Sequence, residues 1–198
     1  MQPFIFNLHL INSIETDLNN STKLNLSESE LIKACINKES FAERVLYDKY
    51  KGRLFTICLR YFKNKEEAED VFTNGFVRIF SKLNSYSGKG SFEGWMKKIM
   101  VNECLMEIRK SVDFKNFIEI EEIPLAAPET ILSELGVQEI MKLIHELPLQ
   151  QRTVFNLYVF EDYSHEEIAQ EMGISIGGSK SQLSRARKKL QDLIISHG

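Results

Sequence analysis

Residues 163–190 read YSHEEIAQEMGISIGGSKSQLSRARKKL, which is the pattern of two short helices joined by a sharp turn. Ser164 and Glu167 have the spacing of a capping box, which predicts a helix start. Gly173 can adopt the left-handed conformation that ends such a helix. The apolar residues expected between the two helices are Ile174, Ile176, Leu183, Ala186 and Leu190. The pattern predicts a helix-turn-helix, whose second helix can enter the major groove of DNA.

The second helix of this pair is strongly basic. Between residues 180 and 189 it contains no acid and five bases: Lys180, Arg185, Arg187, Lys188 and Lys189. Such a run attracts phosphate by releasing condensed counterions, although the whole chain has a net charge of −3. Near the helix start, Ser179, Lys180 and Gln182 are polar groups suited to base edges or phosphates. The basic charge alone would also fit a helix face exposed to solvent. Because this charge occurs together with the capping box and the glycine turn, the sequence favours DNA binding.

The rest of the chain also has helical patterning, so the sequence predicts an all-α fold. Cap-like pairs with a spacing of three residues occur at Ser27 with Glu30, Ser40 with Glu43 and Asn64 with Glu67, each before a run of helical period. A fourth helix is expected to begin at Ser91. The one strand-like segment is FIEIEEI at residues 117–123.

Composition excludes several classes of protein. The chain has 198 residues, of which 43% are hydrophobic, enough for one good core or two small ones. An odd number of cysteines in apolar segments argues against disulfides and fits a reducing cytoplasm, and the four scattered histidines offer no metal site. No apolar run approaches the ~18–20 residues that span a bilayer. We expect no signal peptide, since no basic residue precedes the apolar N-terminal stretch.

An acidic segment separates two helical blocks. Between residues 113 and 134, six acids face a single base, Lys115, and two of the four prolines occur there, which is typical of a flexible linker. The predicted organisation is an N-terminal leader at 1–26, a helical domain at 27–112, a linker at 113–133 and a helix-turn-helix domain at 134–198. The leader is expected either to be disordered or to fold onto the first domain.

The first block resembles region 2 of bacterial RNA polymerase sigma factors. Residues 64–83 read NKEEAEDVFTNGFVRIFSKL, and after a glycine loop residues 91–102 read SFEGWMKKIMVN. The helix-turn-helix block resembles region 4 of the same proteins. Order, spacing and length are similar to the extracytoplasmic-function (ECF) subfamily of the sigma-70 family, which keeps only these two domains. The resemblance covers about residues 27–195.

The resemblance implies a sigma factor, which directs core RNA polymerase to promoters and helps to open them. Such a protein is expected to be no enzyme and to use no cofactor. One helix would dock on the β′ clamp helices through Asp70, Phe72, Thr73, Asn74, Phe76 and Arg78. The alternative for Phe76, and for Phe80, is a place in the core, on the buried face of an amphipathic helix. The loop and the helix that follows it would bind the −10 element through Tyr86, Lys89, Lys97, Lys98 and Asn102. Trp95 is expected to be core rather than a stacking platform, and Tyr86 is either a base contact or an ordinary loop aromatic.

The same resemblance implies that the second helix of the helix-turn-helix reads the −35 element. The expected contacts are Ser179, Lys180, Gln182, Ser184, Arg185, Arg187 and Lys188. The sequence departs from the family at Thr73 and Asn74, where Gln and an acid are usual, and at Gly178, Ser179 and Gln182, where Thr, Val and Arg are frequent. These departures bear on promoter choice rather than on the class of protein.

The implied partners are core RNA polymerase, through the β′ clamp helices and the β flap, and promoter DNA. An anti-sigma factor is expected as well, and the protein is expected in the cytoplasm. A different class remains open from the residues alone: a stand-alone DNA-binding regulator would bind an operator without polymerase, as a dimer. An enzyme would need a nucleophile–base pair or clustered carboxylates, and the sequence contains neither pattern.

Overall fold

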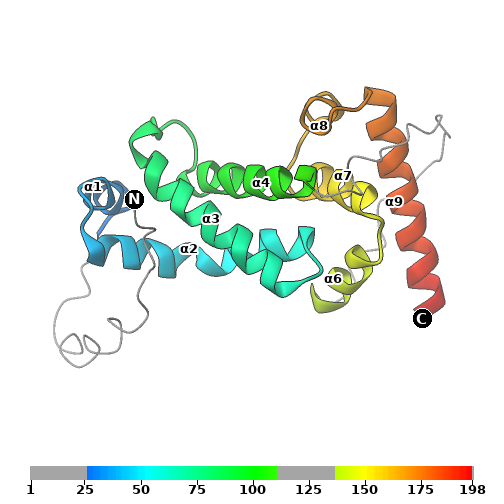
Figure 1. Cartoon of the computed structure of the whole chain (residues 1–198), viewed down its shortest axis with the longest axis horizontal. Coiled ribbons are helices and arrows are strands. Elements are labelled where there is room, and N and C mark those ends of the chain that lie inside the picture. Colours follow the sequence, from blue (N-terminus) through cyan, green and yellow to red (C-terminus); the bar gives the residue numbers. More distant parts are fainter. Residues whose placement is uncertain (1–25, 111–136, 198) are drawn as a thin grey trace.

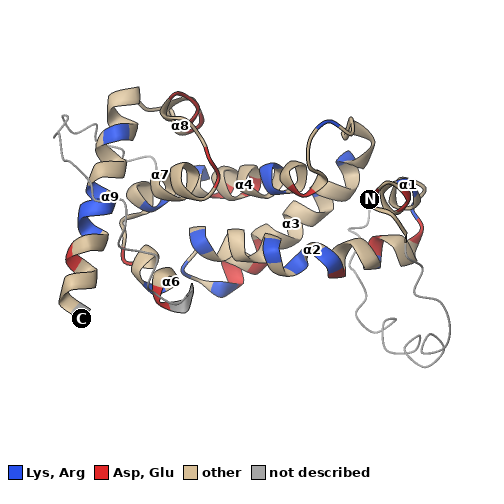
Figure 2. Ribbon diagram, turned by 180° about the vertical axis from the view of Figure 1, so that it is seen from behind, with Lys and Arg blue, Asp and Glu red and all other residues tan. Residues whose placement is uncertain are grey.

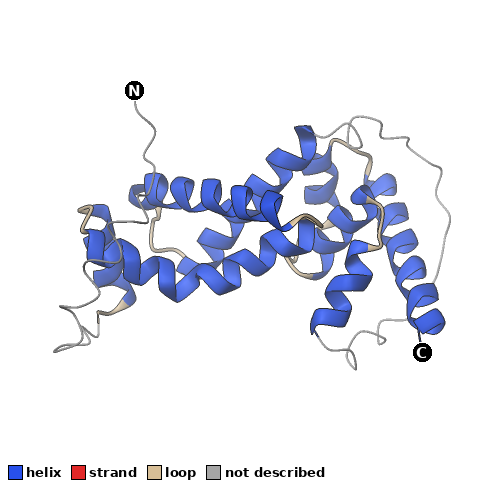
Figure 3. Ribbon diagram, turned by 60° about the horizontal axis from the view of Figure 1, so that its bottom comes forward, coloured by secondary structure: helices blue, strands red, loops and turns tan. Residues whose placement is uncertain are grey.

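The computed structural model describes residues 26–110 and 137–197. Over these ranges the helices are α1 (Glu28–Ile36), α2 (Ser40–Tyr61), α3 (Lys65–Lys82), the short 3-10 helix η2 (Leu83–Ser85), α4 (Phe92–Lys110), α6 (Val137–His145), α7 (Leu149–Val159), α8 (His165–Met172) and α9 (Ile176–His197). The described residues contain no strand (Figure 3), which confirms the all-α prediction. The expected leader, the linker and the strand-like segment at 117–123 lie outside the described residues, apart from Leu26.

Two modules lie side by side along the long axis of the molecule (Figure 1). We call residues 26–110 (α1–α4) the N-terminal module and residues 137–197 (α6–α9) the C-terminal module. In the first, α2, α3 and α4 pack against one another, and in the second, α9 packs on α6, α7 and α8. The two modules touch where α2 packs on α6 and α7.

The helix starts follow the cap residues in most places. Capping boxes form at Ser27 with Glu30 and at Ser164 with Glu167, as the sequence predicted. The Asn64 side chain caps α3 by accepting from the Glu66 backbone N–H at 2.8 Å, rather than by pairing with Glu67. The prediction at Ser40 was wrong: Ser40 is already helical, and the cap position is Glu39, which makes no side-chain cap bond.

The core of the N-terminal module is set by a close approach between α3 and α4. A Cβ added at Gly75 would lie 2.5 Å from the Met100 sulfur, and Met100 is fully buried. Buried side chains from three helices surround this point; they include Leu46, Leu54, Tyr61, Phe72, Ile79, Met96 and Leu105. Gly75 is therefore needed for its small size, because any side chain there would displace Met100 from a filled interior.

All three cysteines lie in the core and none forms a disulfide. Cys35, Cys58 and Cys104 are buried free thiols, and the sulfurs of Cys58 and Cys104 are 4.0 Å apart. Within residues 26–110 and 137–197, no three His, Cys, Asp or Glu side chains are grouped so as to hold a metal ion. Over the same residues, no helix combines the length and apolarity that crossing a membrane requires.

Two glycines of the N-terminal module should respond in opposite ways to substitution. Gly75→Val is expected to lower the free energy of unfolding by about 1–3 kcal/mol, because the added atoms overpack the α3–α4 contact. Gly52 lies in α2 with open space around its Cβ position, so Gly52→Ala should raise stability by about 0.5–1 kcal/mol. Urea denaturation followed by circular dichroism measures both, and equal effects of the two substitutions would contradict the packing described above.

Candidate polymerase-binding and DNA-binding surfaces

One face of α3 is exposed and mostly polar. Asp70, Thr73, Asn74 and Val77 are all exposed, and their spacing of i, i+3, i+4 and i+7 places them in one stripe along the helix. We call these four residues the α3 stripe. Three of them were predicted from the sequence as polymerase contacts. The structure brings them together on a surface that no other described segment covers.

Two further predicted contacts on α3 point the other way. Phe72 and Phe76 are buried, and their rings pack against Tyr47 of α2 at 6.0 and 4.8 Å between centroids. They belong to the face that carries Val71 and Ile79, so the expectation that they contact polymerase is corrected to a core role. Arg78 is partly exposed and pairs with the nearly buried Glu103 of α4.

Val77 is the member of the α3 stripe that the sequence reading missed. Its side chain is 62% exposed, although an apolar residue between Phe76 and Arg78 would ordinarily be assigned to the core. The helical spacing from Asp70, Thr73 and Asn74 was the signal that could have found it. A single exposed apolar side chain is common on protein surfaces, so it is the position of Val77 within the α3 stripe that makes it a candidate contact.

The glycine loop between α3 and α4 is braced from within by Tyr86. Its hydroxyl donates to the Gly90 carbonyl at 2.8 Å, and its ring packs on Phe92 and Trp95 at 5.0 and 5.6 Å. Gly88 and Gly90 both have positive φ, which the tight loop requires. Tyr86 is therefore a loop-shaping residue whose ring is already engaged. Lys89 is exposed at the loop tip.

The predicted DNA-facing residues of α4 differ in their surroundings. Lys98 is exposed, whereas Lys97 and Asn102 are half-buried. The Lys97 ammonium lies 3.3 Å from the Glu93 carboxylate, which also accepts from Arg53 at 2.6 Å. Burial acts to raise the pKa of Glu93, but these two cations outweigh it and the pKa is lowered. Lys97 is thus held in place by an acid of its own helix.

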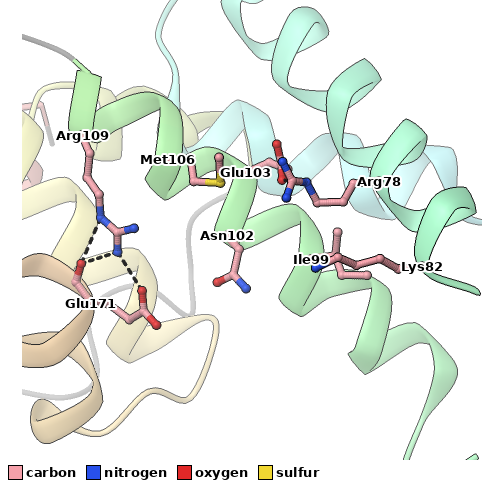
Figure 4. Close-up of a pocket in the computed structure, with 8 residues that line it drawn as sticks. All are labelled: Arg78, Lys82, Ile99, Asn102, Glu103, Met106, Arg109 and Glu171. Carbon is pink, nitrogen blue, oxygen red and sulfur yellow. Dashed lines mark hydrogen bonds and ion pairs between the residues drawn. The ribbon is translucent and has the colours of Figure 1, made fainter. Parts of the chain in front are cut away.

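A mixed-charge cavity of about 260 Å³ opens beside Asn102 (Figure 4). Its walls come from three helices: Arg78 and Lys82 from α3, Ile99, Asn102, Glu103, Met106 and Arg109 from α4, and Glu171 from α8. The Arg109 guanidinium reaches across to Glu171, as the dashed lines in Figure 4 mark. Asn102 therefore faces a space that the C-terminal module closes on one side.

The helix-turn-helix forms as the sequence predicted. Gly173 ends α8 with φ of 66°, and the Ile174 N–H bonds back to the Ala169 carbonyl at 3.0 Å. The Ser175 hydroxyl accepts from the Gly178 N–H at 2.9 Å, which satisfies a backbone donor in the first turn of α9. Ile174 packs against the core, but Ile176 is 42% exposed, so the prediction that both isoleucines fill the interhelical angle was wrong for Ile176.

The start of α9 presents fewer residues to solvent than the sequence suggested. Ser179 is fully buried and Gln182 is 5% exposed, so neither side chain faces DNA as expected. Both lie on the helix face that also carries Leu183 and Ala186, which α7 and α8 cover. The Ser179 hydroxyl is 2.9 Å from Nδ1 of His165. Its role is to join α9 to α8.

The outer face of α9 carries the remaining predicted residues. Lys180 and Lys188 are exposed, while Ser184, Arg185 and Arg187 are half-buried. Lys180, Ser184 and Lys188 are spaced i, i+4 and i+8 and form what we call the α9 stripe. Figure 2 shows that basic residues recur along α9. This stripe is the part of α9 that can meet a groove or a phosphate.

An aromatic stack supports the basic face of α9. The Tyr158 ring stacks on His165 at 4.7 Å, and the Arg187 guanidinium lies 5.6 Å from the Tyr158 centroid. The pKa of His165 is lowered, first by burial and then by Lys180 and Arg187. His165 is therefore neutral at pH 7 and adds no charge to this face. This stack could not be predicted from the sequence, because its members come from three helices.

Comparison with known proteins supports the assignment of both modules. Residues 46–112 match the family described as sigma-70 region 2, and residues 137–190 match the family described as sigma-70, region 4. The two matches occur in the order expected from the sequence. Together they account for more than half of the chain.

Individual relatives carry the same description. The chain is 28% identical over 163 residues to the ECF RNA polymerase sigma factor SigE of Mycolicibacterium smegmatis, covering 77% of this chain and 61% of that protein. It is 28% identical over 174 residues to the ECF RNA polymerase sigma factor SigW of Bacillus subtilis, covering 79% and 92%.

A solved structure shares the fold. The sigma factor RpoE of Bartonella quintana, solved in complex with the anti-sigma factor NepR, superposes with a TM-score of 0.50 at 23% identity, covering 77% of this chain and 96% of that one. Two family matches in the right order, on an all-helical chain with a helix-turn-helix at its end, lead to one conclusion: the chain belongs to the ECF subfamily of the sigma-70 family of RNA polymerase sigma factors.

Proposed function

We propose that this chain binds core RNA polymerase through the α3 stripe, and promoter DNA through α4, its preceding loop and the α9 stripe. As a sigma factor it directs polymerase to specific promoters and assists their opening, which is work done by binding rather than by catalysing a reaction. The residue assignments rest on one observation: the same chain has an exposed stripe on α3 and a basic helix-turn-helix. We place this activity in the cytoplasm, where polymerase acts.

The α3 stripe suits a protein partner better than DNA. It contains one acid, two neutral polar side chains and one exposed valine, and it contains no base. Interface centres are depleted in charge and combine apolar contact with a few hydrogen bonds. Thr73 is partly engaged, since its hydroxyl donates to the Glu69 carbonyl at 2.8 Å, so Asp70, Asn74 and Val77 are the main contacts to the β′ clamp helices.

The loop at residues 84–90 and the exposed edge of α4 suit a single strand of the −10 element. Lys89 and Lys98 offer exposed charges for phosphates, and Asn102 offers an amide for a base edge. Tyr86 acts here by holding the loop in shape.

In this proposal the outer face of α9 recognises the −35 element. Lys180 and Ser184 lie nearest the helix start, where side chains of a recognition helix reach base edges. Lys188, together with Arg185 and Arg187 on its flanks, lies farther along and suits the phosphate backbone. Ser179 and Gln182 position the helix from inside rather than contact DNA.

An anti-sigma factor is a further proposed partner. The sigma factor whose fold this chain shares was solved in complex with an anti-sigma factor. The exposed valine of the α3 stripe offers such a partner an apolar contact.

Transcription in vitro tests the proposed function directly. Purified core RNA polymerase, the full chain and a promoter from upstream of its own gene should yield a discrete transcript that neither polymerase nor the chain yields alone. A variant carrying Asp70→Ala, Thr73→Ala and Asn74→Ala should fail at equal folded content. Tight DNA binding by the chain alone, with no transcript, would instead support a stand-alone regulator.

Val77 should matter for polymerase binding without mattering for folding. Val77→Asp is expected to weaken binding to core polymerase about tenfold, because burying one valine in an interface contributes about 1.5 kcal/mol or more. Ile195→Asp is the matched control, since Ile195 is 72% exposed on α9. Fluorescence anisotropy of labelled chain titrated with core polymerase measures both. An equal loss for the two variants would contradict the assignment.

Substitutions on the two faces of α9 should separate DNA contact from folding. Lys188→Ala should reduce the salt dependence of holoenzyme binding to promoter DNA by about 0.9 in slope, the value expected for one lost phosphate contact. Ser179→Ala should leave that slope unchanged but lower the stability of the chain by about 1 kcal/mol, because it removes the hydrogen bond to His165. A changed slope for Ser179→Ala would show that α9 is turned differently on DNA.

A further inference from the structure

Three helices of the C-terminal module meet at one aromatic ring, that of Tyr158. Tyr158 lies near the end of α7, which packs on both α8 and α9 (Figure 1). Its half-buried side chain contacts His165 at the start of α8 and Arg187 in the middle of α9. We call Tyr158, His165 and Arg187 the Tyr158 cluster. The cluster joins both helices of the helix-turn-helix to the helix that precedes them.

The first contact of the Tyr158 cluster is a stack of two rings. The Tyr158 and His165 rings have centroids 4.7 Å apart and planes inclined by 26°. His165 is itself held from two sides, because it directly follows the capping residue Ser164 and its Nδ1 lies 2.9 Å from the hydroxyl of the buried Ser179. The stack therefore rests on a fixed ring and limits the rotation of the Tyr158 side chain.

The second contact of the cluster is between a cation and an aromatic ring. The central carbon of the Arg187 guanidinium lies 5.6 Å from the centre of the Tyr158 ring. A cation is attracted to a ring face within about 6 Å of its centre. This attraction uses none of the N–H donors of the guanidinium. The Tyr158 ring can therefore hold Arg187 in place and leave its donors available to an acceptor.

Several other arginines are held by carboxylates instead. Their partners are all glutamates, in the pairs Arg53 with Glu93, Arg60 with Glu161, Arg78 with Glu103 and Arg109 with Glu171. Within residues 26–110 and 137–197, no carboxylate pairs with Arg187. A guanidinium that is fixed in position but keeps its charge and donors is suited to bind a phosphate with two parallel hydrogen bonds.

The two groups that share the Tyr158 ring do not repel each other at pH 7. Burial is the largest cause that lowers the pKa of His165, Lys180 and Arg187 lower it further, and Glu166 acts in the opposite direction. The imidazole is therefore neutral at pH 7. Because only the guanidinium is charged, both groups can remain against Tyr158 at the same time.

The position of Arg187 along α9 suits a contact with the DNA backbone. Arg187 directly precedes Lys188 and lies about 16 Å along the helix axis from Ile176, the first residue of α9. Base edges are read mainly from the start of a recognition helix, and contacts to phosphates fix the register of that helix on the duplex. A guanidinium held at a fixed place on α9 would therefore influence which base pairs Lys180 and Ser184 reach.

We infer that Tyr158 is a positioning residue for DNA binding: its ring holds Arg187 where the guanidinium binds a phosphate of the −35 element, and so sets the register of α9 on the DNA. This inference rests on the proposed function of α9. Its consequence is that Tyr158 affects DNA binding only through Arg187.

A double-mutant cycle in the holoenzyme tests the coupling of Tyr158 to Arg187. The full chain is combined with core polymerase, and its binding to the promoter of the transcription assay is measured over a range of salt concentrations. Arg187→Ala should weaken binding about tenfold and lower the slope of log affinity against log salt by about 0.9, as expected for one lost phosphate contact. Tyr158→Leu should weaken binding about threefold and also lower the slope, although it removes no charge. In the Arg187→Ala background, Tyr158→Leu should cause no further loss.

Substitutions that keep the shape of the ring separate the cation contact from packing. Tyr158→Phe keeps the ring face and should bind the promoter as the native chain does. Trifluorophenylalanine at the same position keeps the ring but withdraws electron density from its face, so it should reproduce the loss seen for Tyr158→Leu without a change in melting temperature. Phe160→Leu is the matched control, because the cation on the Phe160 ring is Arg60, which is not assigned to DNA. It should leave the salt slope unchanged.

The possible failures of this experiment have different meanings. An equal loss for Tyr158→Leu with and without Arg187, or native binding by the fluorinated ring, would overturn the inference and leave Tyr158 a purely structural role. A lowered salt slope for Phe160→Leu would overturn it as well, since the effect would then not be specific to Tyr158. Absence of specific promoter binding by the native holoenzyme would overturn the proposed function instead.

Discussion

The crossing of α3 and α4 at Gly75 is the constraint on which both functional faces of the N-terminal module depend. The Met100 side chain occupies the space that a Cβ at Gly75 would need, so the absence of a side chain at Gly75 lets Met100 pack between the two helices. That approach buries Phe72 and Ile79 on one side of α3 and leaves Asp70, Thr73, Asn74 and Val77 on the other. The same crossing orients α4 and the loop before it.

Charge is separated along this chain rather than balanced within each element. The overall net charge of −3 hides a basic α9 and an acidic segment, residues 161–172, that directly precedes it. Arg60 pairs with Glu161 and Arg109 with Glu171, so this acidic segment lies against the N-terminal module while Lys180 and Lys188 of α9 remain exposed.

Most predictions that depend on residues close together in the sequence were correct, whereas several that depend on packing between distant segments were wrong. Capping boxes at Ser27 and Ser164 and the turn at Gly173 depend on residues a few positions apart, and they formed as predicted. Ser179 and Gln182 were assigned to DNA because they are polar and near a helix start. They lie instead on the buried face of α9, where a hydroxyl can bond His165. Val77 was not among the predicted contacts, and it is exposed because no helix packs on it.

The sequence by itself determined the helices, the helix-turn-helix and, through the resemblance they carry, the family, because caps, turns and 3.6-residue periodicity act within a few residues. Only the tertiary structure decided which face of each helix remains available, since burial depends on what packs against it. The contact between the modules was also beyond the sequence. Arg60 and Glu161 are 101 positions apart, and nothing local distinguishes their charges from those that stay in solvent. A desolvated pair of this kind exists only once the fold has brought its members together.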